Sequence, residues 1–176
     1  MKQISTLIAG LVFLLPLTSC KKKSTATVNN FPLAGTYNIK AFGTSYFMEG
    51  MKDPGALPTY HYIDLSQAAK SEIVLKASSI PNTYYMNVPV ISADFTLEDK
   101  MGGGLLYMSK IKSPEDKTQL VYLEKVSNLD AYRIMSQDDH SKFIALDGVT
   151  YASTAVEYKT GTLPAGCEDR WVLEKK

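Results

Sequence analysis

A repeat of about 48 residues constrains the fold of this chain more than any other feature of its sequence. Three series of residues keep this period in the same order: Tyr37, Tyr84 and Tyr132; Phe47, Phe95 and Phe143; and Leu75, Leu123 and Leu173. A fixed period of this size is typical of repeated supersecondary units. The sequence therefore predicts three structural units of nearly equal size.

Short stretches of alternating apolar and polar residues fill each unit, for example Tyr37-Asn38-Ile39-Lys40 and Trp171-Val172-Leu173-Glu174. Alternation with a period of two predicts β-strands, and turn-forming groups such as Asp53-Pro54-Gly55 separate the strands. The expected strands are 36–42, 45–51, 60–66 and 71–77, then 83–90, 93–100, 104–110 and 119–126, then 131–137, 141–147, 154–160 and 169–175. The chain is therefore predicted to be all-β.

Twelve short strands in three equal units resemble the β-trefoil, a barrel capped by three hairpins, and we expect residues 31–176 to form one such domain. A closed barrel also leaves no exposed sheet edge. The third unit, from Tyr132-Arg133-Ile134 to Arg170-Trp171-Val172-Leu173, is similar to the pattern of ricin B-type lectins. This resemblance implies a binding module for carbohydrate.

Ricin-type lectins imply particular residues for a sugar site in the third unit. Their sites use an acid at the end of the second strand, an aromatic residue after the third strand, and an amide pair before a tryptophan. These positions fall on Asp147, on Tyr158, and on Glu168 with Asp169 ahead of Trp171. Acids accept hydrogen bonds from sugar hydroxyls, and an aromatic ring packs against the apolar face of the sugar.

This sequence departs from the lectin pattern because two acids, Glu168 and Asp169, replace the amides. Together with Asp147 they would bring three carboxylates into one pocket, and these would repel one another unless a cation or Arg170 balances them. In the alternative interpretation these residues serve the fold and not a sugar site. Trp171 is then a core residue, and Asp147, which precedes a glycine, forms a turn.

Two other hypotheses for the domain remain. Leu33-Ala34-Gly35-Thr36-Tyr37 resembles the opening Gly-x-Trp region of lipocalin-like lipoproteins, which would imply an eight-stranded barrel with an apolar ligand. The 48-residue period favours the trefoil over that barrel. A trefoil can also be a protein-binding module, as protease-inhibitor and fascin-like trefoils are, and the fold does not decide between these functions.

The N-terminal segment predicts where the domain resides. Lys2 precedes an apolar run from Ile4 to Leu17, which is too short to span a bilayer and is typical of a signal peptide. Leu17-Thr18-Ser19-Cys20 resembles the lipobox of bacterial lipoproteins, and the alternative is an ordinary cleavage site with a chance cysteine. We expect residues 1–19 to be a signal peptide, Cys20 to be lipidated, and residues 20–30 to form a flexible tether. Several acyl chains anchor a protein stably to a membrane.

The charge of the chain limits its partners. Without residues 1–19, the 19 basic residues fall to 18 and face 18 acidic ones, so the mature chain is neutral. Neutrality argues against nucleic acid, which needs a clustered positive field. Lipoproteins of the Bacteroidetes type that are exported to the surface carry acids after the cysteine, whereas this chain has Lys21 to Lys23. We therefore expect attachment to the outer membrane on its periplasmic face.

Catalytic and metal-binding motifs give little support to an enzyme. The sequence has no Gly-x-Ser-x-Gly elbow and no His-Glu-x-x-His, so we expect no enzymatic activity and no cofactor. The paired carboxylates of a glycosidase are recognised by their distance in space, so a sequence does not reveal them. Asp138-Asp139-His140 offers metal-ligand types, but its place between two strands favours a polar hairpin loop. Cys167 would be the one thiol left after Cys20 is lipidated, and we interpret it as a buried or idle group.

Overall fold

The computed structural model describes residues 32–53, 60–68, 71–99, 106–146, 156–163 and 167–176. Its strands are β1 (Gly35–Ala41), β2 (Phe47–Asp53), β3 (Tyr60–Ser66), β4 (Ile73–Ala77), β5 (Thr83–Asn87), β6 (Phe95–Leu97), β7 (Leu106–Lys110), β8 (Val121–Lys125), β9 (Tyr132–Ser136), β10 (Lys142–Leu146), β11 (Val156–Thr160) and β12 (Trp171–Lys175). One short 3-10 helix, η1 (Lys117–Gln119), precedes β8. Each strand overlaps the range predicted for it, so the all-β prediction is confirmed.

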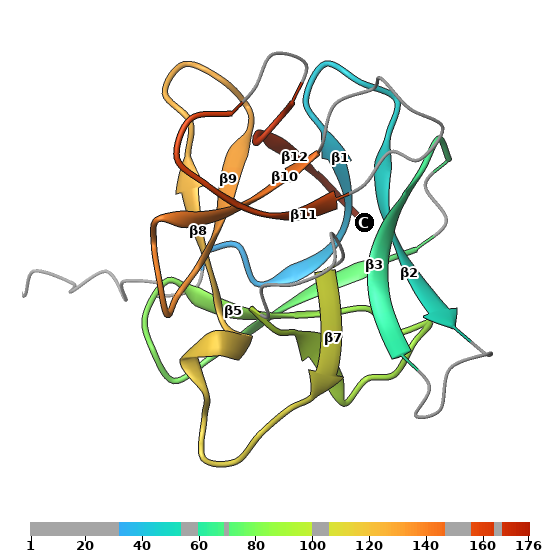
Figure 1. Cartoon of the computed structure of the whole chain (residues 1–176), viewed down its shortest axis with the longest axis vertical. Helices are drawn as coiled ribbons and strands as arrows, with labels where there is room; N and C mark the ends of the chain where they lie inside the picture. The colour runs from blue at the N-terminus through green and yellow to red at the C-terminus, as the bar shows by residue number, and fades with distance from the viewer. Residues whose placement is uncertain (1–31, 54–59, 69–70, 100–105, 147–155, 164–166) are drawn as a thin grey trace, which may run out of the picture.

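The first strand of each unit lies in the same place in the sheet. It pairs with the last strand of the unit before it and with the last strand of its own unit, and β1 accordingly lies beside β12 (Figure 1). The equivalent pairs are Tyr37 with Lys175 and Ile73, Tyr84 with Ala77 and Val121, and Tyr132 with Lys125 and Trp171. This common register confirms the threefold repeat that the sequence predicts.

The lipocalin-like alternative is wrong. The described residues form twelve strands in three four-stranded units rather than one run of eight. In such a run each strand pairs with its chain neighbours, whereas β8 pairs with β5 and β9, which begin two different units. The segment that resembles the lipocalin opening instead contributes β1, which closes the sheet against β12.

The core is built from the inward faces of all three units. Ile39, Met86 and Ile134, which follow the repeated tyrosines by two places, are fully buried. Burial of such side chains is the main favourable contribution to folding. Trp171 is also fully buried, and its indole Nε1 donates a hydrogen bond of 2.8 Å to the carbonyl of Ile144. The structural reading of Trp171 as a core residue is therefore confirmed.

Strand β6 is shorter than the predicted range 93–100 because turns occupy the residues before it. The amides of Ile91 and Ser92 both donate to the carbonyl of Val88. The side-chain amide of Asn87 then donates to the carbonyl of Phe95 at 2.7 Å. These local bonds satisfy backbone groups that a longer strand would pair across the sheet.

The predicted signal peptide (1–19), Cys20 and the tether (20–30) lie outside the described residues. Within the ranges that are described, no helix has both the length and the apolar character that a bilayer crossing requires.

Candidate functional site

The third unit contains a surface pocket of about 450 Å³. It lies where the beginnings of β9 and β10 meet the turn after β11 and the segment that leads into β12. The described residues that line it are Arg133, Phe143, Gly161, Thr162, Leu163 and Asp169. One of the predicted site residues, Asp169, therefore lies at a pocket.

An ion pair and an aromatic ring define the chemistry of this pocket. Arg133 Nε lies 2.8 Å from Asp169 Oδ2, and the Asp169 side chain is 13% exposed whereas that of Arg133 is 48% exposed. A carboxylate that is so little hydrated needs a charged partner, which the guanidinium provides. Phe143 is half-buried and contributes its ring to the same hollow. The pocket thus offers acceptors, donors and an apolar face together.

The other two units use the position of Asp169 differently. Because Ile73, Val121 and Trp171 are equivalent in the sheet, the residues two places before them, Ser71, Gln119 and Asp169, are equivalent as well. Ser71 Oγ accepts a hydrogen bond of 3.0 Å from the amide of Gly50. These side chains in the first and second units are buried and serve their own backbone, whereas Asp169 faces a pocket.

The second unit is closed by its own polar contacts at the corresponding place. Tyr85, the equivalent of Arg133, donates a hydrogen bond of 2.8 Å to Glu115 Oε1, and the amide of Ser79 donates to the same atom at 3.1 Å. Burial, followed by the contact with Glu115, raises the pKa of Tyr85 to about 12. Burial of Glu115 would raise its pKa, but the bonds from Ser79 and Tyr85 outweigh this effect and lower it. The donors that could meet a ligand here are already bound.

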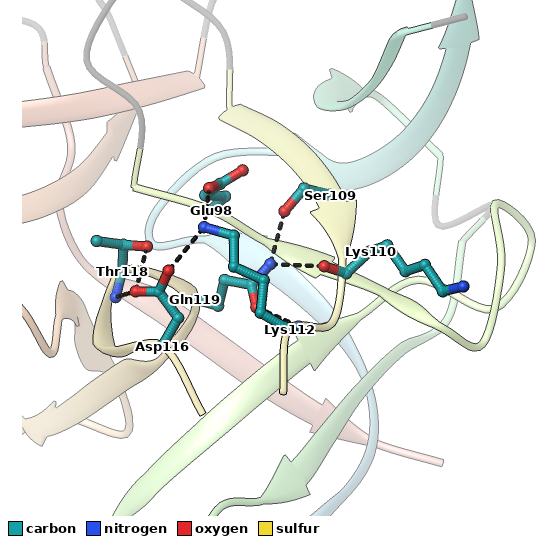
Figure 2. A network of polar contacts seen from close by, with 7 residues as sticks. All are labelled: Glu98, Ser109, Lys110, Lys112, Asp116, Thr118 and Gln119. Atoms are coloured by element: carbon teal, nitrogen blue, oxygen red, sulfur yellow. Dashed lines mark hydrogen bonds and ion pairs between the residues drawn. The ribbon is translucent and has the colours of Figure 1, made fainter. Parts of the chain in front are cut away.

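A network around Lys112 stabilises the same loop of the second unit (Figure 2). Figure 2 shows Lys112 Nζ between two carboxylates, 2.8 Å from Glu98 Oε1 and 2.6 Å from Asp116 Oδ2. Gln119 Nε2 donates to Ser109 Oγ at 2.7 Å. A hollow of about 610 Å³ lies over this loop, but its described lining holds no aromatic ring. We therefore interpret the network as a set of contacts that stabilises the loop, and not as a binding site.

Glu168 does not line the third-unit pocket, and its charge is matched by Arg170. Arg170 donates to Glu168 through Nε and Nη2, both at 2.6 Å, and its guanidinium lies 4.7 Å from the ring centre of Phe42. The backbone of Glu168 also pairs with Leu146. The carboxylate crowding expected from the sequence is thus relieved for the two described acids, because Glu168 and Asp169 each have an arginine.

Tyr158, which the resemblance to lectins places at a sugar site, lies in the hydrophobic core of the structure. The side chain is 8% exposed and belongs to the hydrophobic core, because β11 points Val156 and Tyr158 inward together. Burial, and secondarily the charge of Asp99, raises the pKa of Tyr158 above its ordinary value. Among the described residues that line the pocket, the aromatic ring belongs to Phe143. Asp147 and Cys20, the other two predicted residues, lie outside the described residues.

Sequence reasoning missed Arg133 and Phe143 as site residues, although both carried a signal. Arg133 sits between Tyr132 and Ile134, so the period of two predicts that it points away from the core. Phe143 is a marker of the repeat, so its sequence position was explained before its place at the pocket was considered. The marker in each unit is half-buried rather than part of the innermost core.

The segment Asp138-Asp139-His140 forms a turn between β9 and β10, as expected. Asp139 Oδ1 accepts a hydrogen bond of 2.9 Å from the amide of Ser141, and the ring of His140 stacks on Tyr122 with centres 5.2 Å apart. Nowhere in the described ranges do three or more His, Cys, Asp or Glu side chains gather as metal ligands would. Cys167 is half-buried.

No protein-family profile matches the sequence, and no curated protein matches it either. Solved structures do resemble its fold. A mosquitocidal holotoxin matches 81% of this chain with a TM-score of 0.64 and 18% identity. A Polyporus squamosus lectin, bound to a human-type influenza-binding epitope, matches 81% of the chain with a TM-score of 0.59 and 11% identity. The BEL β-trefoil matches 84% of the chain with a TM-score of 0.54 and 15% identity.

These matches differ in how much of the other protein they cover. The chain spans 17% of the holotoxin chain and 49% of the lectin chain, but 98% of the BEL chain. The identities are low, so the likeness concerns the fold alone. Together with the threefold register, it shows that this chain folds as a β-trefoil.

Proposed function

We propose that this chain is a lipid-anchored, non-enzymatic binding module of the cell envelope that holds a saccharide in its third-unit pocket. The observation that carries the proposal is the Asp169–Arg133 pair beside the Phe143 ring. The likeness to a lectin that binds a saccharide supports it at the level of the fold.

The chemistry of the pocket suits a sugar ring. Asp169 can accept hydrogen bonds from two hydroxyl groups, and the guanidinium of Arg133 can donate to a third oxygen. Phe143 offers an apolar surface to the C–H face of the ring. A hollow of about 450 Å³ lies within the usual size of small-ligand sites.

The same lining supports binding rather than hydrolysis. Glycosidases place two carboxyl groups on either side of the bond that they cleave. Asp169 is the one carboxylate among the described lining residues, and it is held by Arg133. A site of this kind binds and orients its ligand.

The anchor is part of the proposal. The lipobox-like Leu17-Thr18-Ser19-Cys20 supports lipidation at Cys20, and Lys21 to Lys23 support retention on the periplasmic face of the outer membrane. A polar tether of residues 21–30 then separates the trefoil from the bilayer.

A glycan array probed with the full-length chain tests the saccharide proposal. Asp169→Asn and Phe143→Ala should each weaken the strongest hits by about tenfold or more, because each removes a direct contact. Phe47→Ala is the matched control, since Phe47 is the same marker in the first unit. Equal binding by Asp169→Asn, Phe143→Ala and the wild type, or no hits at all, would reject the proposal and leave a protein partner as the second candidate.

A further inference from the structure

A second pocket, of about 460 Å³, lies where the described chain begins. Residues 32 and 33 contribute to its lining, together with the turn before β5 and residues of strands β5, β8 and β9. Its described lining includes Leu33, Asn82, Tyr84, Tyr122, Lys125 and Tyr132. The described residues that line this pocket are all different from those that line the third-unit pocket.

We call this second pocket the barrel-entry pocket, because it lies where the described chain enters the barrel. Aromatic side chains that are held in place by other contacts form its walls. The ring of Tyr122 stacks on His140 with an interplanar angle of 16°, and Lys125 Nζ lies 4.8 Å from the ring centre of Tyr132. The hydroxyl of Tyr84, a buried residue, accepts a hydrogen bond of 3.2 Å from the amide of Leu33. Rings that are held before a ligand arrives lose little entropy on binding.

The positive charge in this lining favours an anionic ligand. Lys125 is the one charged residue among the described residues that line the pocket. Its partner Asp130, at 2.7 Å, has a side chain that is 95% exposed, so the pair lies in water and is weakly held. A carboxylate on a ligand can therefore attract the ammonium group. The third-unit pocket differs, because there Asp169 already balances Arg133.

We propose that the barrel-entry pocket binds an acidic sugar, whose ring packs against Tyr122 and Tyr132 and whose carboxylate meets the ammonium group of Lys125. Stacking on an aromatic ring suits the apolar face of a sugar. The positive charge, with no carboxylate among the described lining residues, favours a uronic acid over a neutral hexose. This inference does not depend on a saccharide being bound in the third unit.

Calorimetric titration of the full-length chain with tri-galacturonate and with the neutral galactotriose tests this assignment. Lys125→Met should weaken tri-galacturonate binding by about tenfold, since it removes a charged contact, and high salt should weaken it as well. Tyr122→Ala should also weaken it. Lys40→Met is the matched control, because Lys40 Nζ likewise lies over a ring, 5.4 Å from the centre of Phe47.

Four results would overturn the assignment. The first two are no binding of tri-galacturonate, and a loss of affinity in Lys40→Met as large as that in Lys125→Met. Loss of tri-galacturonate binding in Asp169→Asn would place the acidic sugar in the third unit. Binding to vesicles of anionic phospholipid that is lost in Lys125→Met, without binding of tri-galacturonate, would identify the pocket as a headgroup site. The saccharide proposed for the third unit is tested separately, so the two proposals can fail independently.

Discussion

Single positions of the repeat show how one fold can hold different side chains. Trp171 fills the place that Ile73 and Val121 take in the other units, and all three are buried. The larger indole requires a partner for its N–H, which the carbonyl of Ile144 supplies. The third unit thus differs from its neighbours at the core as well as at the pocket two residues away.

Tyr158 gives a prediction about alkaline pH. Burial holds the hydroxyl neutral and raises its pKa, whereas an unfolded tyrosine ionises near pH 10, at about its ordinary pKa. Above about pH 10 the unfolded chain loses a proton that the folded chain keeps, so the free energy of unfolding falls as the pH rises. Tyr158→Phe should make this fall shallower, as measured by urea unfolding between pH 8 and pH 11.

The fall should persist in part, because burial also raises the pKa of Tyr37, Tyr84 and Tyr85. Tyr158→Ala serves as a comparison and should cost about 3–5 kcal/mol at pH 8, since it leaves a cavity in the core. An alkaline profile of Tyr158→Phe identical to that of the wild type would contradict the buried, neutral hydroxyl.

The residues of the site were only partly predictable from the sequence. Asp169 could be placed because it precedes Trp171 in a recognisable pattern. The burial of Tyr158 was not predicted, although Val156 two places earlier signals an inward phase. The partnership of Arg133 with Asp169 joins residues on two strands, and no sequence spacing reveals which charges meet in space.

Among the elements, the loop between β7 and β8 shows how one unit is held closed. Lys112 joins Glu98 to Asp116, and Asp116 also caps η1 by accepting a hydrogen bond from the amide of Thr118. The bonds from Lys112 and then Thr118 lower the pKa of Asp116 to about 2. A hollow lies over this loop as well, but the corresponding turn of the third unit lines the pocket that contains Phe143 and Asp169.

Asp116→Asn should make the stability of the protein less sensitive to acid. Because the pKa of Asp116 is lower in the folded state, its contribution is complete above about pH 4 and is lost as the pH falls toward 2. The variant should lose less than about 1 kcal/mol at pH 7, since the pair with Lys112 is partly exposed to solvent. Urea unfolding at pH 7, 4 and 2.5 measures the difference, and a difference that stays constant across these values would contradict the assignment.

The strands themselves were largely predictable. Period-two alternation and the 48-residue repeat are local and additive signals, so every observed strand overlaps its predicted range. The exact bounds of the strands could not be predicted, because side chains such as Asn87 end strands through contacts with the next turn. The pairing of β1 with β12 joins the two ends of the domain and follows from the fold, not from any local pattern.

At the scale of the whole molecule, three similar units have unequal surfaces. The second unit binds its own Glu115 and the third presents an open pocket, so we expect one saccharide in the third unit of each chain. The proposed anchor would hold this module near a membrane, where attachment rather than affinity sets its local concentration.

Lipidation at Cys20 gives a direct prediction for the whole molecule. The wild-type chain, expressed with its N-terminal segment, should incorporate labelled palmitate and partition into the detergent phase. Cys20→Ser should do neither, because the cysteine of the lipobox-like motif is gone, whereas Cys167→Ser should behave as the wild type. Labelling that is retained in Cys20→Ser would contradict the anchor without affecting the saccharide proposal.

Chemical-shift mapping by NMR tests the central claim most directly. When the strongest neutral glycan from the array is titrated into the isotope-labelled chain, the amides of Arg133, Phe143, Gly161, Thr162 and Asp169 should shift together and saturate with one ligand per chain. Shifts that centre instead on Lys112 to Lys117 of the second unit, or that scatter without saturation, would contradict the assignment of the third unit as the binding site.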